Sequence, residues 1–142
     1  MFVDTVTVFN FFEDQESGEC RWYPKVLHGV ELQTAKGIVA DTKGVDTADK
    51  ASLHIPYSGN MTVCGYDYRK PLAWQAYDDK TQCITIAEND FFVEGAFDLA
   101  VVDEADYPEG FYEHMRASYD DVYNITSVNR YDTIPHFEVG GR

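Results

Sequence analysis

The sequence predicts a mainly β (α+β) protein, a small β-barrel or sandwich with one helix at about residues 107–120. Two observations favour this fold class. Short runs of alternating apolar and polar residues, separated by turn residues, recur along the chain with the period of β-strands. One stretch in the C-terminal half instead has the spacing of an amphipathic helix. Eight or more short strands and one helix in 142 residues are typical of a small barrel or sandwich.

The first predicted strand lies at the start of the chain. Val6 and Val8 fall on one face of this strand, and Thr7 and Phe9 fall on the other. Residues 13–19 are polar and acidic and contain a Ser-Gly pair, which predicts a hairpin loop. The chain is therefore expected to open with a β-hairpin.

The rest of the chain contains several shorter apolar runs. Pro24 is expected to mark an edge or end of the strand that begins at Cys20, because proline cannot donate to a strand ladder. Residues 70–74 are expected to form a turn that packs Trp74 against the sheet. The remaining runs predict strands at 26–33, 51–57 and 61–68, a hairpin of 83–86 with 91–95, and a closing hairpin of 123–128 with 133–139.

The helix is predicted from its apolar stripe and from its start. Phe111 and Met115 are four residues apart, so they lie on one face of a helix. Asp106 and Glu109 have the three-residue spacing of a capping box. These signals place the start of the helix near residue 107.

One segment, residues 41–50, has almost nothing to bury. Exposed loops of this length in compact domains are often functional or mobile, although an idle surface insertion is an equal alternative. The candidate interface or channel residues are Asp41, Thr42, Lys43, Gly44, Val45, Asp46, Thr47, Ala48, Asp49 and Lys50.

Length and charge limit the possible functions. The chain is expected to form a single domain over residues 1–142. Its net charge of −14, with Arg69 and Lys70 as the only adjacent basic pair, disfavours tight binding to nucleic acid. No apolar run approaches the roughly 20 residues of a membrane helix, and no secretory signal is recognised. We therefore expect no membrane association and synthesis in the cytoplasm.

The sequence contains no recognisable catalytic or metal-binding motif. It has no HExxH, no GxSxG and no Gly-rich phosphate loop. The cysteines Cys20, Cys64 and Cys83 are far apart and are expected to be free thiols. We therefore predict that the protein is not an enzyme, with no catalytic residue, no cofactor and no metal. Packing could still bring strand histidines together, and an enzyme would need a deep pocket that holds an acid and at least two of His28, His54 and His136.

The aromatic content points to contact with other molecules. Ten Tyr, nine Phe and two Trp exceed what a core of this size needs. Tyr and Trp are enriched at protein interfaces because they provide a large contact area at low entropic cost. A protein–protein interface is the favoured interpretation, and an exposed platform for sugars is the alternative.

A resemblance covers nearly the whole chain. It rests on DTVTVFN at residues 4–10, WYPKVLHGV at 22–30, ITI at 84–86 with DFFVEG at 90–95, and ITSV at 125–128 with IPHFEV at 134–139. This series resembles small head–tail connector or head-closure (stopper-like) structural proteins of tailed phages and prophages of Gram-positive bacteria. These motifs are structural and include no active-site signature.

The resemblance implies a virion structural protein, made in the host bacterial cytoplasm, that forms a homo-oligomeric ring around the DNA channel. Its partners would be further copies of itself and neighbouring portal, connector or tail proteins. DNA would pass nearby without specific binding, since like charges gain no affinity from counterion release. The segment 41–50 would reach into the channel or onto a neighbouring ring. A tail terminator or tail-completion protein is the near alternative, and a carbohydrate- or host-surface-binding β module is the alternative from another class.

Overall fold

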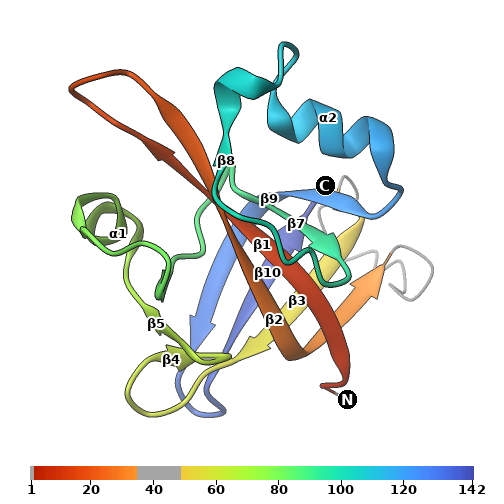
Figure 1. Cartoon of the computed structure of the whole chain (residues 1–142). Coiled ribbons are helices and arrows are strands. Elements are labelled where there is room, and N and C mark those ends of the chain that lie inside the picture. Colours follow the sequence, from red (N-terminus) through yellow and green to blue (C-terminus); the bar gives the residue numbers. More distant parts are fainter. Residues whose placement is uncertain (1, 35–48) are drawn as a thin grey trace.

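A computed structural model describes residues 2–34 and 49–142 (Figure 1). Six antiparallel strands close into a barrel, which confirms the mainly β prediction. Their order around the barrel is β1 (Asp4–Glu13), β7 (Phe91–Glu94), β9 (Val122–Tyr131), β10 (His136–Gly141), β3 (Ala51–Pro56) and β2 (Cys20–Thr34), which pairs again with β1.

Smaller elements surround the barrel. Strand β8 (Val102–Asp103) pairs with β2 and leads through η1 (Glu104–Asp106) to helix α2 (Phe111–Ser118). A separate three-stranded sheet consists of β4 (Thr62–Val63), β5 (Tyr66–Tyr68) and β6 (Cys83–Ile84), with helix α1 (Pro71–Ala76) between β5 and β6. No helix in the described part of the chain has the length and apolar character needed to span a membrane.

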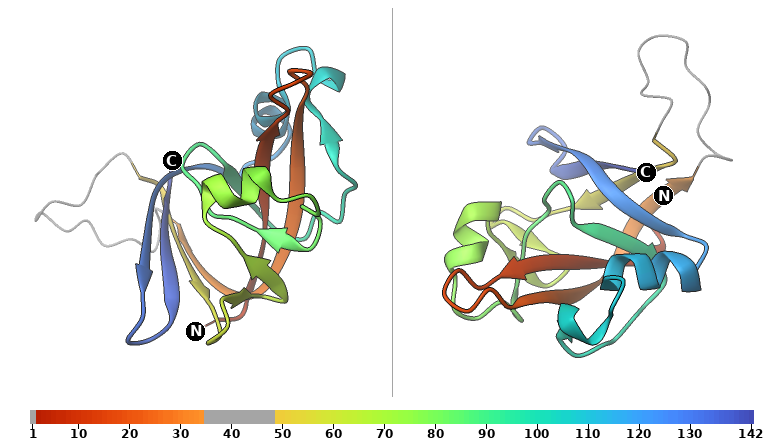
Figure 2. Two further views of the ribbon diagram at one scale, coloured as in Figure 1. Left: turned by 90° about the vertical axis from the view of Figure 1, so that its left-hand side faces the viewer. Right: turned by 90° about the horizontal axis from the view of Figure 1, so that it is seen from above.

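Strand β1 is buried on both faces. Val6 and Val8 point into the barrel, whereas Phe9 points into a second core beneath α2. The far end of the β1–β2 hairpin extends between α1 and the β8–α2 segment (Figure 2). The second core consists of Phe9, Trp22, Phe91, Val93, Phe111, Met115 and Val122.

Pro24 was expected to mark an edge or end of its strand, and the structure shows an unpaired edge position and no strand end. Strand β2 continues through this residue, which lies opposite Phe9 on β1. On its other edge, β2 pairs with β8 only at Arg21 and Trp22 and with β3 only from Glu31 onward. At Pro24 this other edge of β2 therefore has no neighbouring strand. The missing N–H of the proline breaks no strand–strand hydrogen bond on that side.

Two local pairings were also predicted wrongly. Residues 83–86 and 91–95 form no hairpin, because β6 pairs in parallel with β5, while β7 pairs with β1 and β9. Residues 61–68 form two strands rather than one. Cys64 and Gly65 both have positive φ, which is the backbone of a tight hairpin turn between β4 and β5.

The predicted helix is present but begins later than expected. Helix α2 starts at Phe111, and Asp106 belongs to η1 instead of capping α2. The side chain of Glu104 accepts a hydrogen bond of 2.6 Å from the N–H of Phe111 and so satisfies one free donor at the helix start. The expected turn at 70–74 is part of the short helix α1, and the expected burial of Trp74 is confirmed.

Gly29 marks an irregularity where β2 bends. Asp4 pairs with Val30 and Thr5 pairs with His28, so Gly29 is the extra residue of a β-bulge, at φ +77°.

Changing Gly29 to Ala is expected to lower the free energy of unfolding by about 1–2 kcal/mol, because an L side chain is strained in this conformation. Urea denaturation would measure the change. Gly59→Ala is the control, because Gly59 has open space around it and no positive φ. This variant should change the free energy of unfolding by less than about 0.5 kcal/mol. Equal losses in the two variants would contradict the prediction.

Candidate functional site

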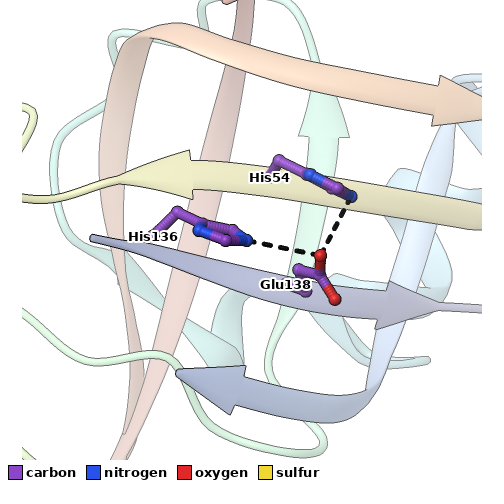
Figure 3. A group of neighbouring side chains, drawn as sticks. All are labelled: His54, His136 and Glu138. Atoms are coloured by element: carbon purple, nitrogen blue, oxygen red, sulfur yellow. Dashed lines mark hydrogen bonds and ion pairs between the residues drawn. The ribbon is translucent and has the colours of Figure 1, made fainter. Parts of the chain in front are cut away.

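Three side chains that could hold a metal ion meet on the outer wall of the barrel (Figure 3). They are His54 on β3 and His136 and Glu138 on β10. His54 lies directly opposite Glu138, and His136 is two residues away from Glu138 and therefore on the same face. Their neighbours Leu53 and Phe137 point into the barrel core, so these three side chains point outward. We call them the His–Glu cluster.

Glu138 bridges the two imidazole rings. Its Oε1 lies 3.3 Å from Nε2 of His136 and 4.0 Å from Nε2 of His54. The side chains of His54, His136 and Glu138 are 23%, 18% and 38% exposed, so the cluster is partly desolvated but open to solvent. Within residues 2–34 and 49–142, this is the one group of at least three His, Cys, Asp or Glu residues whose ligand atoms lie close together.

The ring of His136 is fixed by a hydrogen bond and by stacking. Its Nδ1 lies 2.6 Å from the carbonyl oxygen of Ile134, which can only accept, so Nδ1 carries a proton. The ring stacks on Tyr131 at 5.0 Å and on His54 at 5.7 Å. The hydrogen bond to Ile134 and, after it, the contact with Glu138 raise the pKa of His136 above its usual value, against the effect of burial. Nε2 of His136 consequently faces the carboxylate.

A shallow polar depression of about 300 Å³ adjoins the cluster. Glu138 contributes to its wall together with Ser52 and Asn129, whereas His54 and His136 do not line it. An enzyme was expected to need an acid and two of the histidines in one deep pocket, and this depression holds only the acid. The cluster is therefore a surface site with free space on one side.

The structure separates the other histidines and the cysteines from this cluster. Nδ1 of His28 lies 3.1 Å from the hydroxyl of Thr5. His114, on α2, packs its ring against Tyr107 at 4.8 Å. The cysteines are free, as the sequence predicts: Cys20, Cys64 and Cys83.

Most of the predicted interface or channel segment, residues 41–48, lies outside the described residues. Its last two residues are held against the barrel. The carboxylate of Asp49 accepts a hydrogen bond of 2.8 Å from Thr126, and the backbone N–H of Lys50 donates to the carbonyl of Gly141 at 2.8 Å. The segment therefore rejoins the barrel beside β9 and β10.

Comparison with known proteins identifies a family for this chain. A family model described as "Family of unknown function (DUF6751)" matches residues 1–142. The chain belongs to this family. Among curated proteins nothing matches the chain, and among solved structures nothing matches it either.

The DUF6751 chain also contains a buried lysine that was not predicted from the sequence. Lys25 is 1% exposed, lies opposite Val8 and points into the protein interior. Its Nζ has no hydrogen-bond partner and lies 5.5–6.0 Å from the ring centres of Tyr23, Tyr66 and Trp74. Burial lowers the pKa of Lys25 to about 8, while Cys83, Asp90 and Asp79 oppose this change. The available signal was its position in an alternating strand, opposite an apolar residue.

A buried polar network lies near this lysine. Asn10 donates to the carbonyl of Thr85 at 2.7 Å and to the carboxylate of Asp90 at 3.1 Å. The same carboxylate accepts from the N–H of Phe11 at 3.1 Å. Burial raises the pKa of Asp90 to about 7, against the opposing effects of Phe11, Asn10 and Lys25. The network joins β1 to the segment between β6 and β7.

Proposed function

We propose that the chain is a virion structural protein at the head–tail interface of a tailed phage or prophage. It would assemble as a connector or head-closure ring around the DNA channel, with copies of itself and neighbouring portal, connector or tail proteins as partners. The closed barrel and the family-like sequence pattern over nearly the whole chain support this proposal. The observation that carries it is a groove with apolar side chains on one wall together with an exposed apolar tip elsewhere on the same chain.

The groove lies between the end of the β1–β2 hairpin and helix α1. It encloses about 520 Å³ and is walled on its apolar side by Phe11, Phe12 and Leu72. Leu72 is 87% exposed on α1, although Gln75 of the same helix donates a hydrogen bond of 2.7 Å to the carbonyl of Phe11. The hydrogen bond from Gln75 therefore holds α1 against the hairpin, while the side chain of Leu72 remains exposed.

The exposed apolar tip is the turn between β9 and β10. Ile134 in this turn is 74% exposed. A contact of the tip of one copy with the groove of the next is heterologous, since it uses two different surfaces, and such contacts generate rings when the rotation closes. The proposed occupant of the groove is therefore the Ile134 turn of a second copy.

The charge of the chain fits a surface that DNA passes without capture. The net charge is −14, and a second depression of about 460 Å³ is lined by Asp4, Glu94, Asp120 and Asp121, with Lys50 as the one basic residue among the described residues of its wall. Such a surface gains no affinity for phosphates from counterion release. The exposed aromatic rings of Phe2, Tyr77, Tyr119 and Tyr131 belong to separate parts of the chain, which supports a sugar-binding platform less well.

Size-exclusion chromatography with light scattering, native mass spectrometry and electron microscopy would test the ring. We expect a closed homo-oligomer, and Leu72→Asp or Ile134→Asp should shift the mass to the monomer. Leu99→Asp is the matched control, because Leu99 is exposed but lies outside the groove and the tip; it should leave the ring intact.

A monomer at all concentrations that also fails to bind portal or tail proteins would overturn the proposal. Gene order is an independent check, since we expect the gene between the portal or capsid genes and the tail-tube gene.

A further inference from the structure

We propose that the His–Glu cluster binds one divalent transition-metal ion, with Zn²⁺ as the representative ligand. The inference does not depend on the ring proposed above, because all three ligands come from one chain. Two imidazole nitrogens and one carboxylate oxygen are a set that Zn²⁺ uses in proteins. Imidazole ligands favour zinc, copper and nickel over magnesium and calcium, which prefer oxygen ligands.

The distances within the cluster are close to those of a shared metal. Ligands bound to Zn²⁺ at about 2.0–2.2 Å in a tetrahedron are separated by roughly 3.4 Å. Oε1 of Glu138 lies 3.3 Å from Nε2 of His136 and 4.0 Å from Nε2 of His54, and all three ligand atoms lie within 4.8 Å of one another. The separation of Glu138 and His136 already has this value, and binding of an ion would draw His54 closer to both.

The scaffold holds these side chains in register. His54 and Glu138 are directly paired on two hydrogen-bonded strands, and His136 is held on the same face two residues away. Both strands also pair on their far edges, β3 with β2 and β10 with β9. A ligand set on the interior strands of a closed barrel is more rigid than one on loops.

His136 also has the second contact that metal-bound histidines usually have. Its Nδ1 donates to the carbonyl of Ile134, which leaves Nε2 as the nitrogen that can bind a metal. Stacking on Tyr131 further restricts the ring. In the neutral ring Nε2 therefore carries the free lone pair, and a proton on Nε2 would compete with a metal ion for this atom.

The surroundings favour a cation and leave one position free. Glu31 on β2 lies opposite His54, so a second carboxylate flanks the cluster. The net charge of −14 raises the local concentration of cations. Three protein ligands beside a polar depression leave the fourth position to water or to a group from another molecule.

Isothermal titration calorimetry of the chelator-treated full chain with ZnCl₂ and with MgCl₂ at pH 7.5 would test the site. We expect one Zn²⁺ to bind per chain, and we expect no Mg²⁺ to bind at the His–Glu cluster. His54→Ala and His136→Ala should each weaken Zn²⁺ binding at least about tenfold, and Glu138→Gln should also weaken it. His28→Ala and His114→Ala are matched controls, since these histidines lie outside the cluster, and they should leave the affinity unchanged.

Nuclear magnetic resonance of the histidine rings gives a second measurement on the unmodified protein. The Nε2 signals of His54 and His136 should shift on Zn²⁺ addition, while those of His28 and His114 stay in place. Absence of Zn²⁺ binding up to millimolar concentration would overturn the proposal and leave a hydrogen-bonded His–Glu cluster only. Equal weakening in the control variants would also overturn it, because the binding would then be non-specific.

Discussion

Replacing Asp90 with Asn is expected to flatten the pH dependence of the unfolding free energy between about pH 4 and pH 7. Burial raises the pKa of Asp90 from 3.8 to about 7, so the folded protein retains this proton to a higher pH than the unfolded chain. As pH rises through this window, the unfolded state loses the proton first, and the folded state loses relative stability. At 1.36 kcal/mol per pKa unit, the contribution reaches at most about 4 kcal/mol above pH 7.

Urea denaturation of both proteins at several pH values from 4 to 8 would measure this difference. In the variant, the N–H of Phe11 can still donate to the side-chain amide oxygen, whereas the bond from Asn10 is weakened, so the test is the change with pH and not the absolute stability. Asp98→Asn makes the same charge change at an exposed position and should preserve the wild-type profile. Parallel profiles for the wild type and Asp90→Asn would contradict the prediction.

Lys25 acts in the opposite direction at higher pH. Because its pKa falls from 10.5 to about 8 on burial, the unfolded state holds the proton more tightly between these values. Stability therefore rises as pH increases from about 8 to 10.5. The combined contribution of Asp90 and Lys25 is lowest between pH 7 and pH 8.

Replacing Trp74 with Ala is expected to lower the free energy of unfolding by about 3–5 kcal/mol. The side chain is fully buried on α1 and packs edge to face on Tyr23 at 5.7 Å. Its Nε1 donates to the carbonyl of Cys83 at 3.2 Å, so the change leaves both a cavity and an unpaired acceptor. A helix as short as α1 has little stability without such packing.

Chemical denaturation followed by circular dichroism would measure this loss. Leu99→Ala is the control, because Leu99 is exposed, and it should change the stability by less than about 0.5 kcal/mol. A loss of similar size in both variants would show that Trp74 does not anchor α1.

The sequence was informative where structure is local. The alternation of Val6 and Val8 with Phe9 identified β1 and its two faces. It could not show that both faces are buried, because the second layer comes from α2, about 100 residues later in the chain. The hairpin expected around residues 87–90 failed for the same reason, since the partners of β6 and β7 lie elsewhere in the chain.

The His–Glu cluster shows the same limit. His136 and Glu138 are two residues apart in a strand, so their shared face was predictable from the sequence. His54 is far away along the chain, and only the register of β3 on β10 brings it opposite Glu138. No metal-binding residue was predicted from the sequence. The spacing of residues within one segment does not show which residues of distant strands lie opposite one another.

Closure of the barrel through β1 has a consequence for synthesis of the chain. Phe9 pairs with Phe91, so β1 needs a partner that leaves the ribosome some 80 residues later. At about 5–20 residues per second, Phe9 on β1 is synthesised roughly 4–16 seconds before Phe91 on β7, and still longer before α2. During this interval the aromatic face around Phe9 and Trp22 is uncovered. Strand β1 is thus made well before the strands and the helix that cover it, and its aromatic face stays open to contact with other chains during this interval.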